Sequence, residues 1–251
     1  MFWVNYLFTV NYLVTVSWIP SWLGIIYSKL YMEFTDREFT LDEAERVIKR
    51  SHDYVKVALS KLCKAGWCIR ESKGKYKLLD PLECILLTGG LSDALNKVPQ
   101  KEYIPLLRRL IVEFLKAFRS SLLAVILFGS VARGTAHRTS DVDLLVVIKE
   151  LPKSYLRRAS LLADVIAKVR EEKMKLWSKG IYVSVQAFAY TPEELKEFHA
   201  FYFDLAFDGI VLYSRMGYAE RLLEDIRRRL RKMNVRKVVM PGGRWYWIVE
   251  S

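Results

Sequence analysis

Cysteine is scarce in this sequence of 251 residues: there are three, Cys63, Cys68 and Cys84. They are too few for a disulfide framework, and they lack the paired short spacings of a zinc site. We therefore expect a reducing, cytoplasmic setting. Apolar residues, in contrast, make up 52% of the chain and charged residues 27%, a composition that excludes wholesale disorder.

Acidic residues are also in deficit. The 40 Lys and Arg outnumber the 28 Asp and Glu, which gives a formal net charge of +12 and an isoelectric point near 9.5. Such an excess favours a polyanionic partner, for example a nucleic acid, a nucleotide or an acidic membrane face. The length predicts one large domain or two small ones.

Charge is absent altogether from the first 28 residues. The run is long enough for a transmembrane helix, but Asn5, Asn11 and Pro20 interrupt it. No basic segment precedes it, and no small-residue cleavage site follows. We expect residues 1–20 to be an apolar strand or flap packed on the protein, with a membrane anchor as the less favoured alternative and a mis-assigned start codon as the third.

Residues 21–82 predict a small helical domain that ends in a hairpin. Apolar residues recur at helical spacing from Leu23 to Leu30, and Glu38–Thr40 is a short extended piece. Thr40 and Glu43 have the spacing of a capping box that begins a second helix. Ser51 begins a third, and Gly66 stands where a glycine commonly ends a helix. Two alternating strands then flank a turn of sequence Ser72-Lys73-Gly74-Lys75.

This order of elements resembles a winged helix-turn-helix, and the sequence ALSKLCKAGWCIRESKGKYKL resembles its recognition helix and wing. The stretch 44–80 holds ten Lys and Arg against four Asp and Glu. The resemblance implies nucleic-acid binding, with the third helix in a major groove and the wing on phosphates. The candidate contacts are Lys56, Lys61, Lys73 and Lys75. Dimerisation or protein docking is the alternative use of such a domain.

A connector and an amphipathic helix are expected over residues 83–120. Thr88-Gly89-Gly90 interrupts the chain, and an apolar stripe at helical spacing extends from Leu106 to Phe118.

The most informative stretch is 125–148, in which two apolar runs flank a turn. The first run ends in Gly129-Ser130, and the second follows Asp141-Val142-Asp143. Glycine lets a backbone approach a ligand closely, and a helix that begins at Ser130 favours a phosphate. Asp141 and Asp143 are two apart on a strand, so both carboxylates point to one face. Paired carboxylates beside an anion-binding turn suit Mg²⁺ with a nucleotide.

Gly129-Ser130, ten residues and Asp141-x-Asp143 together resemble the signature of the polymerase-β-like nucleotidyltransferases, most closely the minimal nucleotidyltransferases of prokaryotes. The resemblance implies an α+β fold with a mixed sheet over residues 121–251. It also implies catalytic and metal-binding roles for Asp141 and Asp143, and nucleotide binding by Gly129, Ser130, Arg133 and Ser140. Active members carry a third carboxylate on the next strand, where this chain has Ser184 and Gln186. Glu193 or Glu194 is a possible substitute.

Beyond the motif, the sequence predicts a long charged helix over 154–177, a strand over 181–190, and a helix start at Thr191-Pro192. The stretch 201–213 resembles the closing helix and strand of these domains. A basic helix over 221–236 and the aromatic run that follows admit two roles: a nucleic-acid patch or, as we prefer, a charged surface helix and a core plug.

Two functions follow from these patterns. The favoured one is a Mg²⁺-dependent transfer of a nucleoside monophosphate from ATP or another nucleoside triphosphate to a hydroxyl group, with a partner protein among the possible acceptors. The alternative is a winged-helix DNA-binding regulator whose nucleotidyltransferase domain senses nucleotide with little or no turnover, as the neutral Ser184 and Gln186 suggest. A non-catalytic assembly module is the third.

Overall fold

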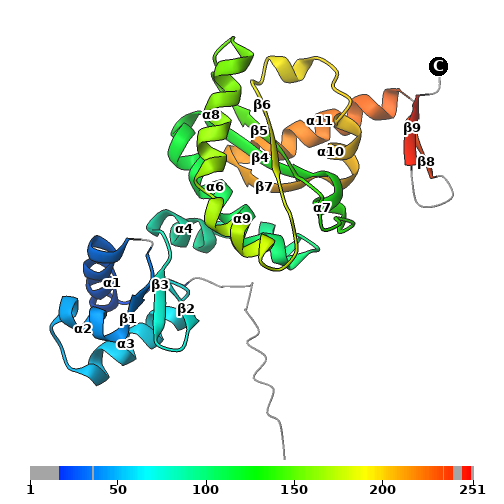
Figure 1. Cartoon of the computed structure of the whole chain (residues 1–251). Helices are drawn as coiled ribbons and strands as arrows, with labels where there is room; N and C mark the ends of the chain where they lie inside the picture. The colour runs from blue at the N-terminus through cyan, green and yellow to red at the C-terminus, as the bar shows by residue number, and fades with distance from the viewer. Residues whose placement is uncertain (1–16, 36, 234, 240–244, 250–251) are drawn as a thin grey trace, which may run out of the picture. The chain divides into compact units, whose positions relative to one another are not determined.

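The computed structural model of the protein describes residues 17–35, 37–233, 235–239 and 245–249 (Figure 1). The chain divides into two compact units, 1–93 and 94–251. The four-part division predicted from the sequence, at residues 20, 82 and 120, stays a prediction. Most of the apolar segment 1–20 lies outside the described residues. None of the helices in the described ranges is both long and apolar enough to cross a membrane.

The first unit has the order of elements that the sequence predicts. These elements are α1 (Ser21–Phe34), β1 (Phe39–Thr40), α2 (Leu41–Ile48), α3 (His52–Lys64), β2 (Cys68–Ser72) and β3 (Lys75–Leu78). The three strands pair antiparallel in the order β1-β3-β2. Its classification as a winged helix stays a prediction, while the helices and the hairpin themselves are confirmed.

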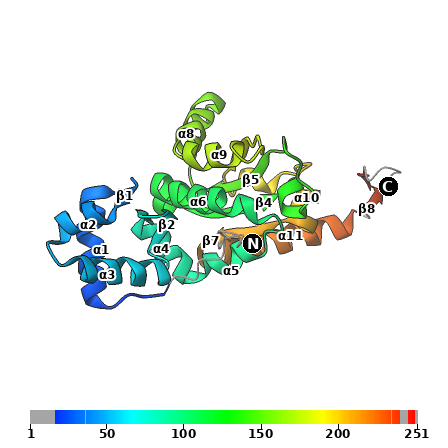
Figure 2. The ribbon, with the colours of Figure 1, turned by 60° about the horizontal axis from the view of Figure 1, so that its bottom comes forward.

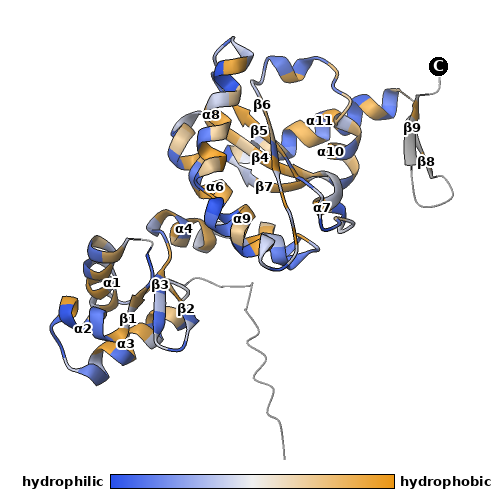
Figure 3. Cartoon of the chain, in the orientation of Figure 1, coloured by the Kyte–Doolittle hydropathy of each residue, from blue (hydrophilic) through white to orange (hydrophobic). Residues whose placement is uncertain are grey.

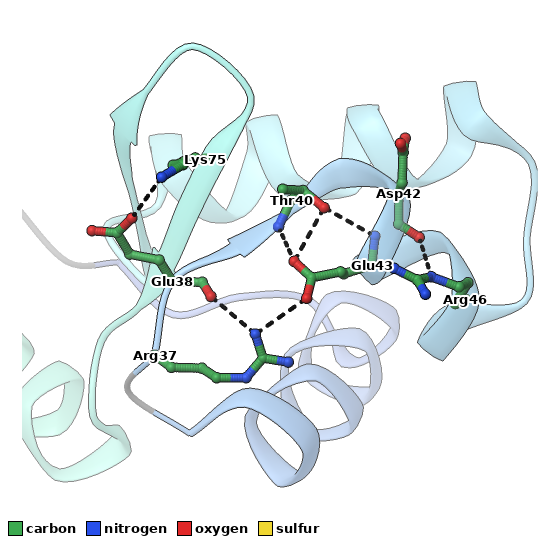
Figure 4. A network of polar contacts seen from close by, with 7 residues as sticks. All are labelled: Arg37, Glu38, Thr40, Asp42, Glu43, Arg46 and Lys75. Carbon is green, nitrogen blue, oxygen red and sulfur yellow. Dashed lines mark hydrogen bonds and ion pairs between the residues drawn. The ribbon is translucent and has the colours of Figure 1, made fainter.

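The start of α2 confirms the predicted capping box, which Figure 4 shows. The backbone N–H of Thr40 donates to Glu43 Oε2 at 2.7 Å, and the backbone N–H of Glu43 donates to Thr40 Oγ1 at 3.3 Å. Arg37 donates to the same carboxylate at 3.2 Å. The Thr40 N–H and the Arg37 guanidinium lower the pKa of Glu43. The N–H groups of the N-cap residue Thr40 and of Glu43, the third residue of α2, are thus satisfied locally.

After the hairpin the chain forms three short helical pieces. They are α4 (Pro81–Leu86), the kinked segment η1 (Leu87–Leu91) and α5 (Ser92–Asn96). Gly90 has φ of +105°, a left-handed conformation that L side chains rarely adopt. The predicted interruption at Gly89-Gly90 is therefore confirmed.

The second unit is built on a four-stranded mixed sheet in the order β6-β5-β4-β7. Its strands are β4 (Leu122–Phe128), β5 (Val142–Ile148), β6 (Val185–Tyr190) and β7 (Ile210–Ser214). β5 pairs antiparallel with β4 and parallel with β6, which confirms the mixed sheet. The helices are α6 (Ile104–Phe118), α7 (Gly129–Arg133), α8 (Tyr155–Ala167), α9 (Arg170–Trp177), α10 (Tyr202–Asp208) and α11 (Tyr218–Lys232). The unit also contains the single 3-10 turns η2 (Lys101–Tyr103), η3 (Arg119–Ser121), η4 (Glu194–Lys196) and η5 (Arg215–Gly217). A strand pair follows α11: β8 (Val235–Val239) and β9 (Trp245–Val249).

Helices cover both faces of this sheet, as Figures 1 and 2 show. α10 and α11 pack on one face, against alternate residues of β4 and β5 that include Ile126, Phe128 and Leu145. α6 and α8 contact the sheet as well, and Figure 2 shows them on the opposite face. β4 and most of β5 are fully buried, in keeping with their apolar colour in Figure 3.

Four predicted elements differ in the structure. The long helix of 154–177 is two helices, because the backbone of Val169 leaves helical geometry between α8 and α9, although its side chain is buried as predicted. The strand of 181–190 pairs only from Val185, and the chain after Thr191 forms the single turn η4 (Glu194–Lys196) rather than a helix. The basic helix ends at Lys232, before β8. The helix and strand predicted over 201–213 are confirmed as α10 and β7.

A buried carboxylate ties α6 to the chain between α8 and α9. The side chain of Glu113 is 3% exposed. Its Oε1 lies 3.2 Å from Arg109 Nη2 and 3.4 Å from Lys116 Nζ, and its Oε2 lies 3.7 Å from Lys168 Nζ. Burying a charge is costly without such partners, so the cations compensate for its desolvation.

We expect Glu113→Ala to destabilise the second unit by about 3–5 kcal/mol, because it removes the buried carboxylate on which Arg109, Lys116 and Lys168 converge. Lys168→Ala is the matched control: its side chain is 54% exposed, and the loss of an exposed ion pair costs roughly 0–1 kcal/mol. Urea unfolding followed by circular dichroism measures both. An equal loss in the free energy of unfolding of the two variants would show that the burial of Glu113 does not determine how much it stabilises the unit.

Candidate active site

The turn and the carboxylate pair of the sequence motif meet where β4 ends and β5 begins. Phe128 pairs with Asp143 across the two antiparallel strands, so Gly129 lies directly beside that carboxylate. Gly129 has φ of +75°, and a Cβ atom built on it would lie 2.3 Å from Asp143 Oδ2. Only glycine fits both the conformation and the space. The Asp143 carboxylate thus packs against the backbone of the Gly129-Ser130 turn.

Asp141 and Asp143 flank the buried Val142 and are themselves half-buried. Partial burial raises the pKa of Asp143 to about 6, and the charges of Asp141 and Asp204 act in the same direction. Arg133 opposes the rise. Negative charge therefore accumulates around Asp143, which is the electrostatic setting that a bound cation relieves.

The loop between the turn and the carboxylates is held by its own hydrogen bonds. The backbone N–H of Thr135 donates to Ser130 O at 2.9 Å. The Ser140 hydroxyl accepts from the His137 N–H at 2.8 Å, and the Ser140 N–H donates to His137 O at 3.1 Å. Ser140 closes a turn in this structure, while Ser130 is half-buried in the first turn of α7. Their contacts with nucleotide stay predictions.

Arg133, predicted to neutralise phosphate charge, lies against two carboxylates of α10. Its Nη1 is 3.1 Å from Asp208 Oδ2 and 3.4 Å from Asp204 Oδ1. Asp204 and Asp208 are four residues apart and so lie on one face of the helix. The arginine therefore fastens the end of α7 to α10, and its role toward phosphate stays a prediction.

A second brace comes from the residues that precede α6. The side-chain amide of Gln100 makes two hydrogen bonds with the backbone of Ala136: Ala136 N–H donates to Oε1 at 3.0 Å, and Nε2 donates to Ala136 O at 3.1 Å. Next to it, Gly134 has φ of +75°, and a Cβ atom there would lie 2.8 Å from Pro99 Cβ. Pro99 and Gln100 thus fix the path of the loop between Ser130 and Asp141.

The predicted location of a third carboxylate is neutral. Gln186 is the partner of Asp143 in the parallel pairing of β5 and β6, and it is exposed. Glu193 and Glu194 follow the opposite end of β6, where Glu194 pairs with Arg158 at 2.7 Å. The acid that acts on Asp143 from another element is instead Asp204 of α10, through its charge.

The two motif carboxylates form a small acidic site rather than a full cage. Within the described ranges, no cluster of three or more His, Cys, Asp and Glu is arranged to hold a metal ion. Mg²⁺ is commonly held by one or two carboxylates together with substrate phosphates. The close pair of Asp141 and Asp143 and the raised pKa of Asp143 fit that mode.

The predicted nucleic-acid contacts lie in the first unit. Lys56 and Lys61 are exposed on α3, and Lys73 is exposed at the turn of the hairpin. Lys75 is exposed as well, and its Nζ lies 3.7 Å from Glu38 Oε2. Lys61 Nζ lies 5.2 Å from the centre of the Trp22 ring. Their contacts with nucleic acid stay predictions.

Sequence comparison assigns the chain to a class of enzymes that transfer nucleotidyl groups. The family described as "Nucleotidyltransferase domain" matches residues 108–212, from α6 to β7. A candidate protein adenylyltransferase of Methanocaldococcus jannaschii, MJ1305, is 32% identical over 126 residues, which cover 49% of this chain and 82% of that protein. The chain therefore belongs to the nucleotidyltransferase family and is a transferase.

Solved structures with some likeness come from toxin–antitoxin complexes. One, determined with AMP-PNP, is 20% identical, covers 49% of this chain and 86% of its own, and has a TM-score of 0.32. Another contains a tri-AMPylated HEPN toxin of Shewanella oneidensis with its MNT antitoxin; it is 16% identical, covers 51% and 87%, and has a TM-score of 0.31. Both TM-scores lie below 0.5, so the family assignment rests on the sequence matches alone.

Sequence reasoning missed the residues that brace the site. Asp204 and Asp208 carry a recognisable signal, since two acids four residues apart in a mostly apolar helix need a cationic partner. Gln100 carries none, because its partner is a backbone segment 36 residues further along the chain.

The raised pKa of Asp143 predicts that its ionised carboxylate lowers the free energy of unfolding. Its folded-state pKa, about 6, exceeds the ordinary value of about 3.9, so the ionised form destabilises the fold. The stability present at low pH is lost as pH rises through 6. We expect Asp143→Asn to stabilise the protein in EDTA at pH 7.5 by roughly 1–2 kcal/mol, allowing for the partial exposure of the group.

Thermal unfolding from pH 4 to pH 8 measures this difference, and the midpoints of wild type and variant should converge as pH falls below 4. An equal difference at pH 4 and pH 8 would mean that the variant acts through packing and not through charge.

Proposed function

We propose that this protein transfers a nucleoside monophosphate from ATP or another nucleoside triphosphate to a hydroxyl group on a protein. The observation that carries the proposal is the contact between the Asp143 carboxylate and the Gly129 backbone, which joins the anion-binding turn to the carboxylate pair. The name of the Methanocaldococcus relative supports a protein as the acceptor.

In this reaction the acceptor oxygen attacks the α-phosphorus, the bond to the β-phosphate oxygen breaks, and pyrophosphate leaves. The turn at Gly129-Ser130 would hold the β- and γ-phosphates through its backbone and hydroxyl donors. The brace formed by Gln100 would keep that turn at a fixed distance from Asp141, because it holds the loop between them. Fixed placement of the reacting groups lowers the barrier without any change in the protein during the reaction.

Asp141 and Asp143 would hold Mg²⁺ together with the triphosphate. When bound, the ion neutralises charge on the phosphates and on the leaving pyrophosphate. The neutral Gln186 beside Asp143 makes this a two-carboxylate site, with the charge of Asp204 as a further influence.

The test is incubation of the pure protein with Mg²⁺, cell lysate and ATP labelled at either the α- or the γ-phosphate. We expect protein-bound label from α-labelled ATP alone, since the β- and γ-phosphates leave as pyrophosphate. The Asp141→Asn/Asp143→Asn double variant should lose at least about 100-fold in transfer, the scale at which removal of an electrostatic contact to a transition state is felt. It should also lose Mg²⁺-dependent ATP binding.

Asp164→Asn is the matched control, because Asp164 is an exposed acid on α8. It should transfer like wild type. Label from the γ-phosphate would indicate phosphorylation, and unchanged ATP titrations with the double variant would show that the acidic pair is not part of the site.

DNA binding by the first unit is the second candidate function, with the transferase unit as a nucleotide sensor. The exposed face of α3 favours it, because cationic and apolar groups alternate there: Tyr54 and Val57 are 40% and 50% exposed beside Lys56 and Lys61. The Tyr54 ring lies 6.0 Å from that of Trp22. Apolar groups on a helix can contact thymine methyl groups while lysines contact phosphates.

If Lys56, Lys61, Lys73 and Lys75 contact phosphates, duplex affinity should fall with salt at a log–log slope of about −0.9 per contact. Changing all four to Ala should flatten the slope by roughly three to four units and weaken all sequences alike. Glu38→Gln, which removes the partner of Lys75, should strengthen binding, and ATP binding should not change. A quadruple variant with the parental slope would assign the unit to protein docking.

A further inference from the structure

The edge strand β6 extends the face of the sheet on which Asp143 lies. In the parallel pairing, Asp143 lies beside Gln186 and Leu145 beside Phe188. Side chains on neighbouring strands that pair in this way share a face, and residues two apart on one strand do too. Phe188 is therefore the next side chain after Gln186 on the face of the carboxylate pair. The order β6-β5-β4-β7 puts both at the open margin of the sheet.

The core buries only part of the Phe188 side chain. Its ring centre lies 5.9 Å from that of Phe128 and 6.3 Å from that of Phe201, with the latter pair nearly parallel. Even so, Phe188 is 40% exposed, whereas Phe128 is 5% exposed. A single exposed phenylalanine needs no explanation of its own. This one is distinctive because the ring it rests on, Phe128, directly precedes Gly129.

The spacing suits a nucleotide. Neighbouring strands are about 4.8 Å apart and residues two apart on a strand are about 6.6 Å apart, which places the Cα atoms of Asp143 and Phe188 about 8 Å from each other. That separation is comparable with the reach of a ribose and base from an α-phosphate. On the other side of β5, the Asp143 face is closed by α10 and α11. Gln186 and Phe188, the next two side chains on the face of Asp143, are both exposed.

We propose that Phe188 is a stacking platform for the base of the nucleoside triphosphate. The proposal rests on the proposed transfer reaction and deepens it, because it assigns a place to the nucleoside as well as to the triphosphate. Phe128 and Phe201 support the ring from the protein side and fix its plane. Stacking uses the π-face that every base has, so this subsite selects for the presence of a base more than for its identity.

The test separates the base from the phosphates by comparing two ligands, Mg²⁺–ATP and Mg²⁺–tripolyphosphate, in equilibrium titrations. We expect Phe188→Ala to weaken ATP binding between about 5- and 100-fold, the range of one base–aromatic stack. Tripolyphosphate should bind unchanged, since it makes no contact with the ring. Phe188→Tyr should restore ATP binding, and Phe188→Leu, which keeps bulk without a π-face, should not.

Phe198→Ala is the matched control. Phe198 is 48% exposed in the same unit, but its ring packs on Tyr202 and Phe203 instead of Phe128. It should bind both ligands like wild type. Thermal unfolding identifies any variant that does not fold. If Phe188→Ala is one of them, Phe188→Leu replaces it in the comparison with wild type.

Each other outcome contradicts the assignment. If ATP and tripolyphosphate weaken together, the ring acts by supporting the carboxylate site. If ATP binding is unchanged but transfer to protein is lost, the ring serves the acceptor. If wild type itself binds no Mg²⁺–ATP, the transfer reaction fails and the subsite with it, a result distinguishable because it appears without any substitution.

Discussion

The close approach of Asp143 to the backbone of Gly129 is the constraint on which the rest of the second unit depends. A side chain at residue 129 would collide with the carboxylate, and the positive φ of the residue is one that other amino acids rarely adopt. Both requirements arise because β4 and β5 pair antiparallel with Phe128 opposite Asp143. A change in that register would separate the turn from the carboxylates, and the chain would keep its sheet but lose the site.

Two pairs of acidic residues lie around this contact, and they affect stability in opposite directions. The charges of Asp141 and Asp143 repel one another, and partial burial adds to this at Asp143, whose ionised form weakens the fold. The neighbouring pair of Asp204 and Asp208 shares the guanidinium of Arg133, which compensates part of its charge and strengthens the attachment of α7 to α10. Aspartates thus lower stability at one pair and raise it at the other, and direct contact with the Arg133 guanidinium makes the difference. The burial of β4 and most of β5 offsets the destabilisation caused by the ionised Asp143.

Much of this could be predicted from the sequence wherever the determinants are local. The capping box at Thr40 and the interruption at Gly90 depend on residues within a few positions of each other, and they were predictable. The apolar runs before Gly129 and after Asp143 predicted the two central strands for the same reason. The split between α8 and α9 was not, because Val169 keeps the helical spacing of buried residues while its backbone leaves helical geometry. The braces from Gln100 and α10 depend on pairing over 36 and more than 70 residues, which no local pattern encodes.

The Gln100 brace has a consequence for what counts as the catalytic unit. Similarity to the family extends over residues 108–212, and a fragment cut to those limits would hold every residue of the motif. It would lack the amide that anchors Ala136 and the proline that packs on Gly134. The same limits exclude α11, whose apolar face completes the core beneath Asp143. The part of the chain that matches the family is therefore smaller than the part whose contacts support the motif, because Pro99, Gln100 and α11 all lie outside residues 108–212.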